Sequence, residues 1–309
     1  MPQPVNRDAA TLRWGIVTTV KAPLLQIARF SAYHLDLGVH RMHIHLDTPD
    51  PAIAARLAHP RIQFIQCDAT YWQDRPDRTT STHQMRQIYN ASRVYRATSL
   101  DWLAHIDVDE FILAPGPLPD LLARVSADDT HVNLSPVEMM DTQGDPHHFK
   151  RYARASKRRV IYPTFGEYIK GGFLSTTSPK VFARTGLQNV SLGIHALRHF
   201  GNKVWSGASL PGLELGHAHA PDFETFRRHM TYRLDKGSYH NRKGKMNPIG
   251  LLIRTLLEDP DPDALRALHR ELSSPTPDRL ERLNDAGLLR TETLNLDAKV
   301  AQHFGTLEG

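Results

Sequence analysis

The interpretation of the chain begins with one stretch, Trp102-Leu103-Ala104-His105-Ile106-Asp107-Val108-Asp109-Glu110-Phe111. Here an apolar run of strand length ends in three carboxylates within four positions. In an open α/β sheet, ligands bind beyond the carboxyl ends of the strands. In an extended chain Asp107 and Asp109 point the same way, with Cα atoms roughly 6–7 Å apart. Two hard carboxylates at that spacing suit one Mg²⁺ or Mn²⁺ ion, which leaves coordination positions for diphosphate oxygens. The alternative is an acidic turn that caps a helix or faces solvent.

Upstream of this stretch, strand and helix patterns alternate. The sequence predicts strands at 14–20, 41–46, 61–66 and 102–106, and helices at 23–37, 52–58 and 82–98. Such alternation is typical of βαβ units, which build a parallel, doubly wound sheet. We therefore expect an α/β fold with a Rossmann-like, mostly parallel central sheet flanked by helices.

Beyond residue 111 the alternation weakens. The pattern predicts a strand at 130–134, a loop at 141–157, short strands at 160–162 and 180–184, and helices at 223–234 and 248–257. The tail from residue 261 is predicted to be helical. These patterns suggest an N-terminal extension (1–13), one domain (14–245) with halves at 14–112 and 113–245, and a helical C-terminal segment (246–309).

Composition narrows the possible classes of protein. The chain has 309 residues, of which 40% are hydrophobic and 23% charged, as in ordinary folded proteins. Its net charge of +5 suits a phosphate-bearing ligand but is too diffuse to indicate nucleic-acid binding. Cys67 is the single cysteine, so an intramolecular disulfide and a cysteine-based zinc site are excluded. No apolar run reaches the roughly 18 residues that span a bilayer, and the polar start of the chain argues against a signal peptide. We therefore expect a cytoplasmic protein.

Several stretches together resemble one enzyme family. Segment 102–111 is similar to the Trp-(x)4-Asp-x-Asp-Glu-Phe motif of the family-2-like branch of GT-A glycosyltransferases. Agreement in order and spacing extends to Val17-Thr18-Thr19-Val20-Lys21, Tyr33-His34-Leu35-Asp36-Leu37-Gly38-Val39, Leu46-Asp47-Thr48-Pro49-Asp50, and to Gln87 and Asn90. The resemblance covers about residues 14–240 and is strongest over 14–112. The chain departs from the family at Lys21-Ala22-Pro23, where Lys-Asn-Glu is usual, and at Arg29-Phe30, where Glu-Trp is usual.

The resemblance implies a set of donor-binding residues. It puts the nucleotide at Thr18, Lys21, Asp47, Gln87 and Asp107, and a Mn²⁺ or Mg²⁺ ion at Asp107 and at the second aspartate of the motif, Asp109. Asp47 ends a strand beside the point where the strand order of the predicted sheet reverses. It is therefore well placed to accept a hydrogen bond from a ribose hydroxyl or a base N–H. Ordinary strand packing is the alternative for Thr18, and a turn or helix N-cap is the alternative for Asp47.

A pair of histidines forms the second notable cluster. In Gly216-His217-Ala218-His219, an extended backbone places both imidazoles on one side, as a metal or phosphate site requires. The stretch resembles the late histidine motif of the family, where a histidine completes the metal shell. The register to Phe226 favours His217, with His219 as the second candidate. The alternative is that one of the two is an ordinary loop or helix-capping residue.

The remaining candidates concern the acceptor and the proton. The resemblance puts Lys180 and His195 near the diphosphate or the acceptor, where Lys180 would neutralise charge on the leaving group. A solvated surface lysine is the alternative. An inverting transfer also needs a general base. The candidates are Asp141, Glu138 and Glu167, with Asp141 favoured because Glu138 lies nearer the end of a predicted strand.

The expected function is metal-dependent transfer of a sugar from a nucleotide-diphosphate donor, with a UDP-sugar as the expected donor. The acceptor is a saccharide, a lipid-linked molecule or another hydroxyl compound. Inversion follows from the resemblance alone. Two rivals remain: a metal-dependent phosphohydrolase or nucleotidyltransferase that uses the same carboxylates, and a non-catalytic nucleotide-sugar-binding protein.

Overall fold

The computed structural model describes residues 8–75, 77–141, 144–204, 207–220, 222–235, 239, 244–261 and 263–307. The chain divides into two compact units that interleave along the sequence. The first unit comprises Met1–Ser135, Ser178–Leu215 and Asn295–Gly309, and the second comprises Pro136–Thr177 and Gly216–Leu294. The expected α/β class is confirmed, and each unit has its own apolar core.

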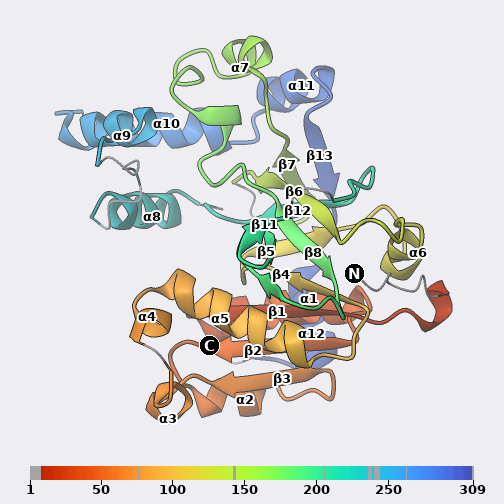
Figure 1. Cartoon of the computed structure of the whole chain (residues 1–309). Helices are drawn as coiled ribbons and strands as arrows, with labels where there is room; N and C mark the ends of the chain where they lie inside the picture. Colours follow the sequence, from red (N-terminus) through yellow and green to blue (C-terminus); the bar gives the residue numbers. More distant parts are fainter. Residues whose placement is uncertain are drawn as a thin grey trace. The chain divides into compact units, whose positions relative to one another are not determined.

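The sheet of the first unit is built around four parallel strands (Figure 1). In spatial order these are β4 (Trp102–His105), β1 (Trp14–Val20), β2 (Arg41–Leu46) and β3 (Ile62–Gln66). β8 (Lys180–Arg184) pairs antiparallel with β4, and β6 (His131–Met139) pairs antiparallel with β8. The sheet is therefore mixed, and its four parallel strands are those for which alternation with helices predicted parallel pairing.

Helices cover both faces of these parallel strands. On one face lie α1 (Leu24–Asp36), α2 (Pro51–Arg56) and α12 (Leu296–Phe304), whose apolar side chains join the same core as Trp14 and Ile44. On the other face α5 (His83–Ala97) packs on β1 and contributes Ala91 and Val94 to a separate core with Val17 and Leu103. Figure 1 shows α5 lying across the parallel strands.

Shorter elements complete the first unit. They are η1 (Ala9–Thr11), α3 (Ala69–Trp72), α4 (Asp77–Thr80), β5 (Glu110–Leu113), α6 (Leu118–Ala123), and a small antiparallel sheet of β9 (Val190–Leu192), β10 (Leu197–His199) and β11 (Asn202–Lys203). The strand β12 (Glu214–His217), whose first two residues belong to this unit, pairs with β5.

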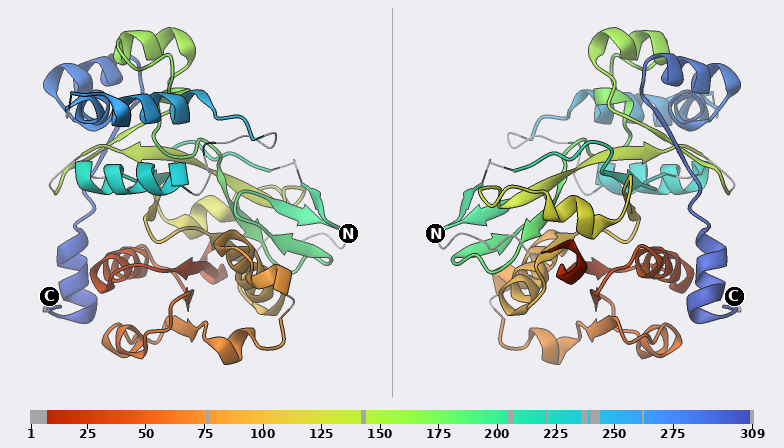
Figure 2. Two further views of the ribbon diagram at one scale, coloured as in Figure 1. Left: turned by 90° about the vertical axis from the view of Figure 1, so that its left-hand side faces the viewer. Right: turned by 90° about the vertical axis from the view of Figure 1, so that its right-hand side faces the viewer.

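The second unit combines a small antiparallel sheet with a group of helices. The end of β6 pairs with β7 (His147–Lys150), which pairs in turn with β13 (Leu289–Glu292). The helices are α7 (Ala155–Ile161), η2 (Lys170–Gly172), α8 (Phe223–Asp235), α9 (Pro248–Glu258), α10 (Ala264–Ser273) and α11 (Pro277–Asp285). Figure 2 shows α8, α9 and α10 beside one another, and their side chains share one core with Tyr162 and Phe226.

Three segments of the second unit differ from the sequence-based expectation. The tail predicted to be helical from residue 261 contains the strand β13. The segment predicted as a loop at 141–157 contains β7 and the start of α7. The strand predicted at 160–162 is wrong, because Val160 and Ile161 end helix α7. Ile161 and Tyr162 are buried in the core of this unit. A short apolar run does not by itself distinguish a strand from a buried helix end.

Among the described residues, no helix combines the length and the apolar character needed to cross a membrane.

One buried histidine ties α1 to β5. His34 is fully buried, and its Nδ1 lies 2.8 Å from the carbonyl oxygen of Phe30. The backbone N–H of Ile112 donates to its Nε2 at 3.3 Å. Because a carbonyl only accepts and an amide only donates, the neutral ring carries its hydrogen on Nδ1. Burial lowers the pKa of His34 to about 3, so the ring stays neutral in the folded protein.

We predict that His34→Gln makes stability less dependent on pH. The pKa is lowered in the folded state, so the contribution of His34 is complete above about pH 6.5 and is lost as the pH falls toward 3. Between pH 6.5 and 5.0 the wild-type unfolding free energy should fall by about 1.5 kcal/mol more than that of the variant. Urea unfolding at both pH values measures this difference. His199→Gln serves as the control, and an equal pH dependence in wild type and His34→Gln would contradict the prediction.

Candidate functional site

Helix α5 presents a polar face to the carboxyl ends of the parallel strands. His83, Arg86, Gln87 and Asn90 are spaced i, i+3, i+4 and i+7, which places them on one side of a helix. Their partners come from four different strands or strand ends. The helix begins at Thr82, whose side chain accepts a hydrogen bond from the backbone N–H of Met85 and so caps the first turn.

Asp47 follows β2 and is bound by the start of α5. Its carboxylate accepts two hydrogen bonds of 2.6 Å from Arg86, one to each oxygen, and lies 3.1 Å from Nδ1 of His83. Burial alone would raise the pKa of Asp47, but these hydrogen bonds hold it well below its usual range. The side chain is 5% exposed. Asp47 is thus a fixed anion whose two oxygens already have donors.

Asp107 follows β4 and receives two further side chains. Gln87 donates to Oδ1 at 2.8 Å, and the ammonium of Lys180 donates to Oδ2 at 2.6 Å. The backbone N–H of Asp107 donates to the carboxylate of Glu110 at 2.8 Å. The same Glu110 oxygen lies 3.4 Å from the ammonium of Lys180. The acidic turn after β4 is therefore held in shape by its own carboxylates and by one lysine.

Lys180 is a buried cation rather than a solvated one. It is 1% exposed, and β8 carries it next to β4. Burial alone would lower its pKa, but Glu110, Asp107 and Asp109 outweigh that effect and raise the pKa. Asp109 is partly exposed. Three carboxylates and one ammonium give this group of four residues a formal charge of −2, which favours a further cation.

The other predicted nucleotide contacts lie along the same strand ends. Thr18 is fully buried within β1, beside Ile44 of β2. Lys21 is exposed directly after β1. Asn90 donates to the hydroxyl of Thr19 at 3.0 Å, which links α5 to β1. The strand order changes direction at β1, so Lys21 and Asp107 flank the switch point of the parallel strands.

His195 lines a polar cavity of about 310 Å³ beside β6 and β8. Its Nδ1 lies 3.2 Å from the carbonyl oxygen of Pro179, the residue before Lys180. The strand period of two places His131, Asn133 and Ser135 on one face of β6, where they form the floor. The ten lining residues include no carboxylate; they are His131, Asn133, Ser135, Pro179, Val181, His195, Ala196, Lys203, Val204 and Ser209.

The predicted histidine pair lies in the second unit. His217 and His219 are each 6% exposed, and their ring centroids are 5.2 Å apart. The ring of His229, from α8, lies 4.9 Å from that of His219. Burial, with the nearby Arg233, lowers the pKa of His219 well below its usual value. The imidazole is therefore neutral, as a metal ligand must be.

The three candidate bases also lie in the second unit. Glu138 is 2% exposed, accepts from the backbone N–H groups of Leu174 and Ser175, and pairs with Lys150 at 3.0 Å. Burial would raise the pKa of Glu138, but Lys150 and these donors lower it. Glu167 is exposed and pairs with Arg159 at 2.8 Å. Asp141 is half-buried after β6, and its backbone N–H donates to Ser273.

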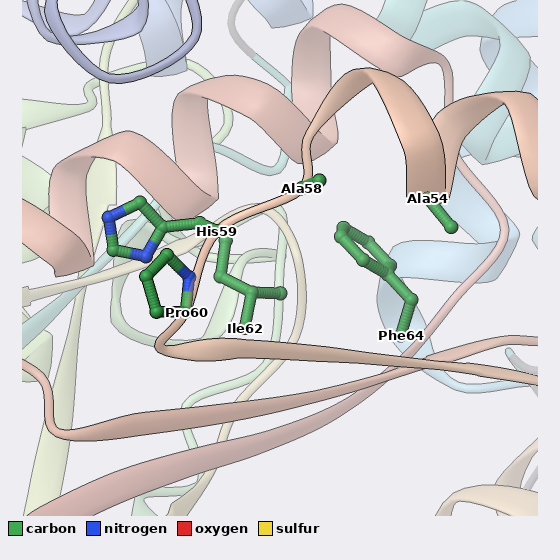
Figure 3. Close-up of a pocket in the computed structure, with 6 residues that line it drawn as sticks. All are labelled: Ala54, Ala58, His59, Pro60, Ile62 and Phe64. Atoms are coloured by element: carbon green, nitrogen blue, oxygen red, sulfur yellow. The ribbon is translucent and has the colours of Figure 1, made fainter.

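A further cavity, of about 520 Å³, is apolar and contains none of the predicted site residues. Figure 3 shows Phe64 of β3 facing Ala54 and Ala58, with Ile62, His59 and Pro60 at the other side. Of its six lining residues, only His59 is ionisable, so the cavity lacks the acid–base groups expected of an active site.

No protein-family model matches the chain, and no curated protein matches its sequence. The function proposed below therefore rests on the residues of this chain, on their geometry and on the resemblance described above.

Sequence reasoning missed the partners of the acidic residues. Arg86 and His83 were not singled out, although they bind Asp47. The spacing of polar residues along 82–98 was the available signal, because a helix that buries one polar face needs partners for it. Lys150 is fully buried against Glu138, which no local sequence pattern indicates.

We predict that Glu138→Gln is strongly destabilising. The neutral amide would leave the ammonium of Lys150 buried without its counter-charge, at a cost on the order of 3 kcal/mol. Glu167→Gln, at an exposed pair, should change the unfolding free energy by about 0.5 kcal/mol or less. Urea unfolding of both variants measures the difference. A fully stable but inactive Glu138→Gln protein would instead support a catalytic role.

Proposed function

We propose that the chain is a metal-dependent glycosyltransferase that transfers a sugar from a nucleotide-diphosphate donor, a UDP-sugar, to an acceptor hydroxyl, with inversion. One observation carries the proposal: three carboxylates gather after β4 around a single buried lysine and leave a formal charge of −2 in this group of four residues. Such a group attracts a divalent cation, and through it a diphosphate.

The position of the acidic group agrees with this function. The group follows a strand next to the switch point of four parallel strands, where open α/β sheets bind nucleotides. The exposed Lys21 follows the neighbouring strand β1. The resemblance to GT-A glycosyltransferases, with their mostly parallel nucleotide-binding sheet, supports the same site. Asp47 is proposed to contact the ribose or the base. That contact would either replace the hydrogen bonds from Arg86 or form beside them.

The donor types of three residues suit the proposed ion. Asp109 offers the carboxylate oxygen that a hard cation prefers. By the resemblance, His217 or His219 would supply an imidazole nitrogen, which suits Mn²⁺ better than Mg²⁺. Asp107 is already bound by Gln87 and Lys180, so its proposed role is to position the turn that carries Asp109. When bound, the ion would supply positive charge that stabilises the departing nucleoside diphosphate.

Two residues are proposed for the acceptor side. Asp141 is the proposed base, because the oxygens of Glu138 already accept from Lys150 and two amides, and Glu167 forms a surface pair. An acceptor hydroxyl would lose its proton to Asp141 as it attacks the anomeric carbon. His195 is proposed to hold the acceptor in the polar cavity that it lines.

We predict that Asp109→Asn abolishes metal-dependent nucleotide binding without unfolding the protein. A neutral amide is a poorer ligand for a hard cation, and Asp109 is only partly buried. Titration calorimetry should detect UDP binding to the wild type with Mn²⁺ and not with EDTA. The affinity of Asp109→Asn with Mn²⁺ should fall at least about tenfold, a loss of about 1.4 kcal/mol. Asp128→Asn, at an exposed position, is the matched control. Unchanged Mn²⁺–UDP affinity in Asp109→Asn would rule out the proposed metal site.

We also predict that the wild-type protein releases nucleoside diphosphate from one member of a nucleotide-sugar panel, with Mn²⁺ present and UDP-sugars foremost. Asp141→Asn should keep Mn²⁺–UDP affinity and lower the rate of sugar transfer at least about a hundredfold, as loss of a general base does. Liquid chromatography of the products separates the rival functions. Inorganic phosphate or a nucleoside monophosphate as the main product would indicate a phosphohydrolase or nucleotidyltransferase. Binding without turnover across the panel would indicate a non-catalytic binding protein.

A further inference from the structure

The strand β2 carries a polar face that the donor site does not use. Arg41, His43 and His45 alternate with Met42, Ile44 and Leu46. The three apolar side chains join the core under α1. The side chains of Arg41, His43 and His45 therefore point to the opposite face of the sheet, on which α5 lies. An inner strand of an α/β sheet is usually apolar on both faces, so this face has a specific use.

Two adjoining cavities lie along this polar face. One, of about 390 Å³, is lined by Arg13, His40, Arg41, His43, Ala97, Thr98, Ser99 and Leu100. The other, of about 350 Å³, is lined by His43, His45, Gln63, Ile65, Tyr71, Arg93, Val94, Ala97 and Thr98. They share His43, Ala97 and Thr98, so we treat them as one groove, the β2 groove. Three arginines and three histidines line it, and no carboxylate does.

One end of the β2 groove is strongly basic. Arg13 donates to the carbonyl oxygen of Ser99 at 2.8 Å, and Arg41 donates to that of Pro60 at 2.8 Å. These bonds hold both guanidinium groups at the groove. Burial lowers the pKa of His40, and the neighbouring Arg13 and Arg61 lower it further against the opposing effect of Asp101. Positive charge thus prevails at this end even though one carboxylate lies close by.

The other end of the groove is aromatic and apolar. Arg93 lies over the ring of Tyr71, with its central carbon 5.4 Å from the ring centroid, and Ile65 and Val94 complete the wall. His45 also lines this end and is 2% exposed.

We propose that the β2 groove binds a small molecule that joins an oxyanion, a phosphate or a carboxylate, to a flat ring. The oxyanion lies against Arg13, Arg41 and His40, as paired guanidinium groups favour. The ring lies at the end formed by Tyr71, Ile65 and Val94. None of these residues belongs to the proposed donor site, so binding requires no divalent ion.

The experiment uses four probes in EDTA: phenyl phosphate, inorganic phosphate, benzoate and acetate, each titrated into the full chain and followed by NMR or calorimetry. Phenyl phosphate or benzoate should bind about 2- to 10-fold more tightly than the matching anion without a ring, the range expected for one aromatic contact. The stronger of the two aromatic probes identifies phosphate or carboxylate as the preferred oxyanion. Absence of saturable binding by all four probes would overturn the proposal, as would equal affinities with and without the ring.

Variants locate the binding. Arg41→Gln and Arg13→Gln should each weaken the best probe at least about fivefold. Tyr71→Leu should reduce the affinity of the aromatic probe to that of the bare anion. Arg124→Gln, at an exposed position of the same unit, and Asp109→Asn should leave it unchanged. Thermal unfolding establishes that each variant is folded, and Arg13→Gln provides the second test if Arg41→Gln is not. Unaltered binding in a folded arginine variant would refute the assignment.

Discussion

The ammonium of Lys180 lies buried between Asp107 and Glu110, and the shape of the candidate site depends on it. A buried lysine is tolerated only when carboxylates compensate its desolvation, so β8 is tied to the acidic turn after β4. Glu110 in turn accepts the backbone N–H of Asp107. The turn that carries Asp109 is therefore fixed by the ammonium of Lys180 and by the carboxylates of Asp107 and Glu110. The formal negative charge of this group is the physical basis of the proposed cation-dependent function.

Helix α5 supplies side-chain hydrogen-bond donors to groups at the ends of the parallel strands. Gln87 reaches the turn after β4, Arg86 the turn after β2, and Asn90 both β1 and the residue after β3. These bonds satisfy polar groups that would otherwise be buried without partners. The same helix also lines the β2 groove through Arg93 and Val94. The first half of α5 thus contacts the acidic turn, which suits a cation, and its second half lines the basic groove, which suits an anion.

The second unit uses the same kind of interaction for a different purpose. Lys150 is fully buried, like Lys180, but Glu138 accepts from it and from two backbone amides and so has no oxygen without a donor. A carboxylate committed in this way stabilises its unit and is a poor proton acceptor. His219, whose imidazole is neutral, and the neighbouring His217 are the candidate metal ligands of this unit.

The sequence by itself determined the α/β class, the four parallel strands and the acidic turn, because periodicity and local turn chemistry depend on neighbours along the chain. The resemblance also named Lys180 and His217 as candidates. Only the tertiary structure decided that Lys180 is buried against Asp107, that Arg86 binds Asp47, and that segment 160–162 ends a helix. Partners separated by 39 and 73 positions leave no local pattern. Whether a charged side chain is buried in a fixed ion pair depends on how the chain packs. It therefore cannot be read from one sequence position at a time.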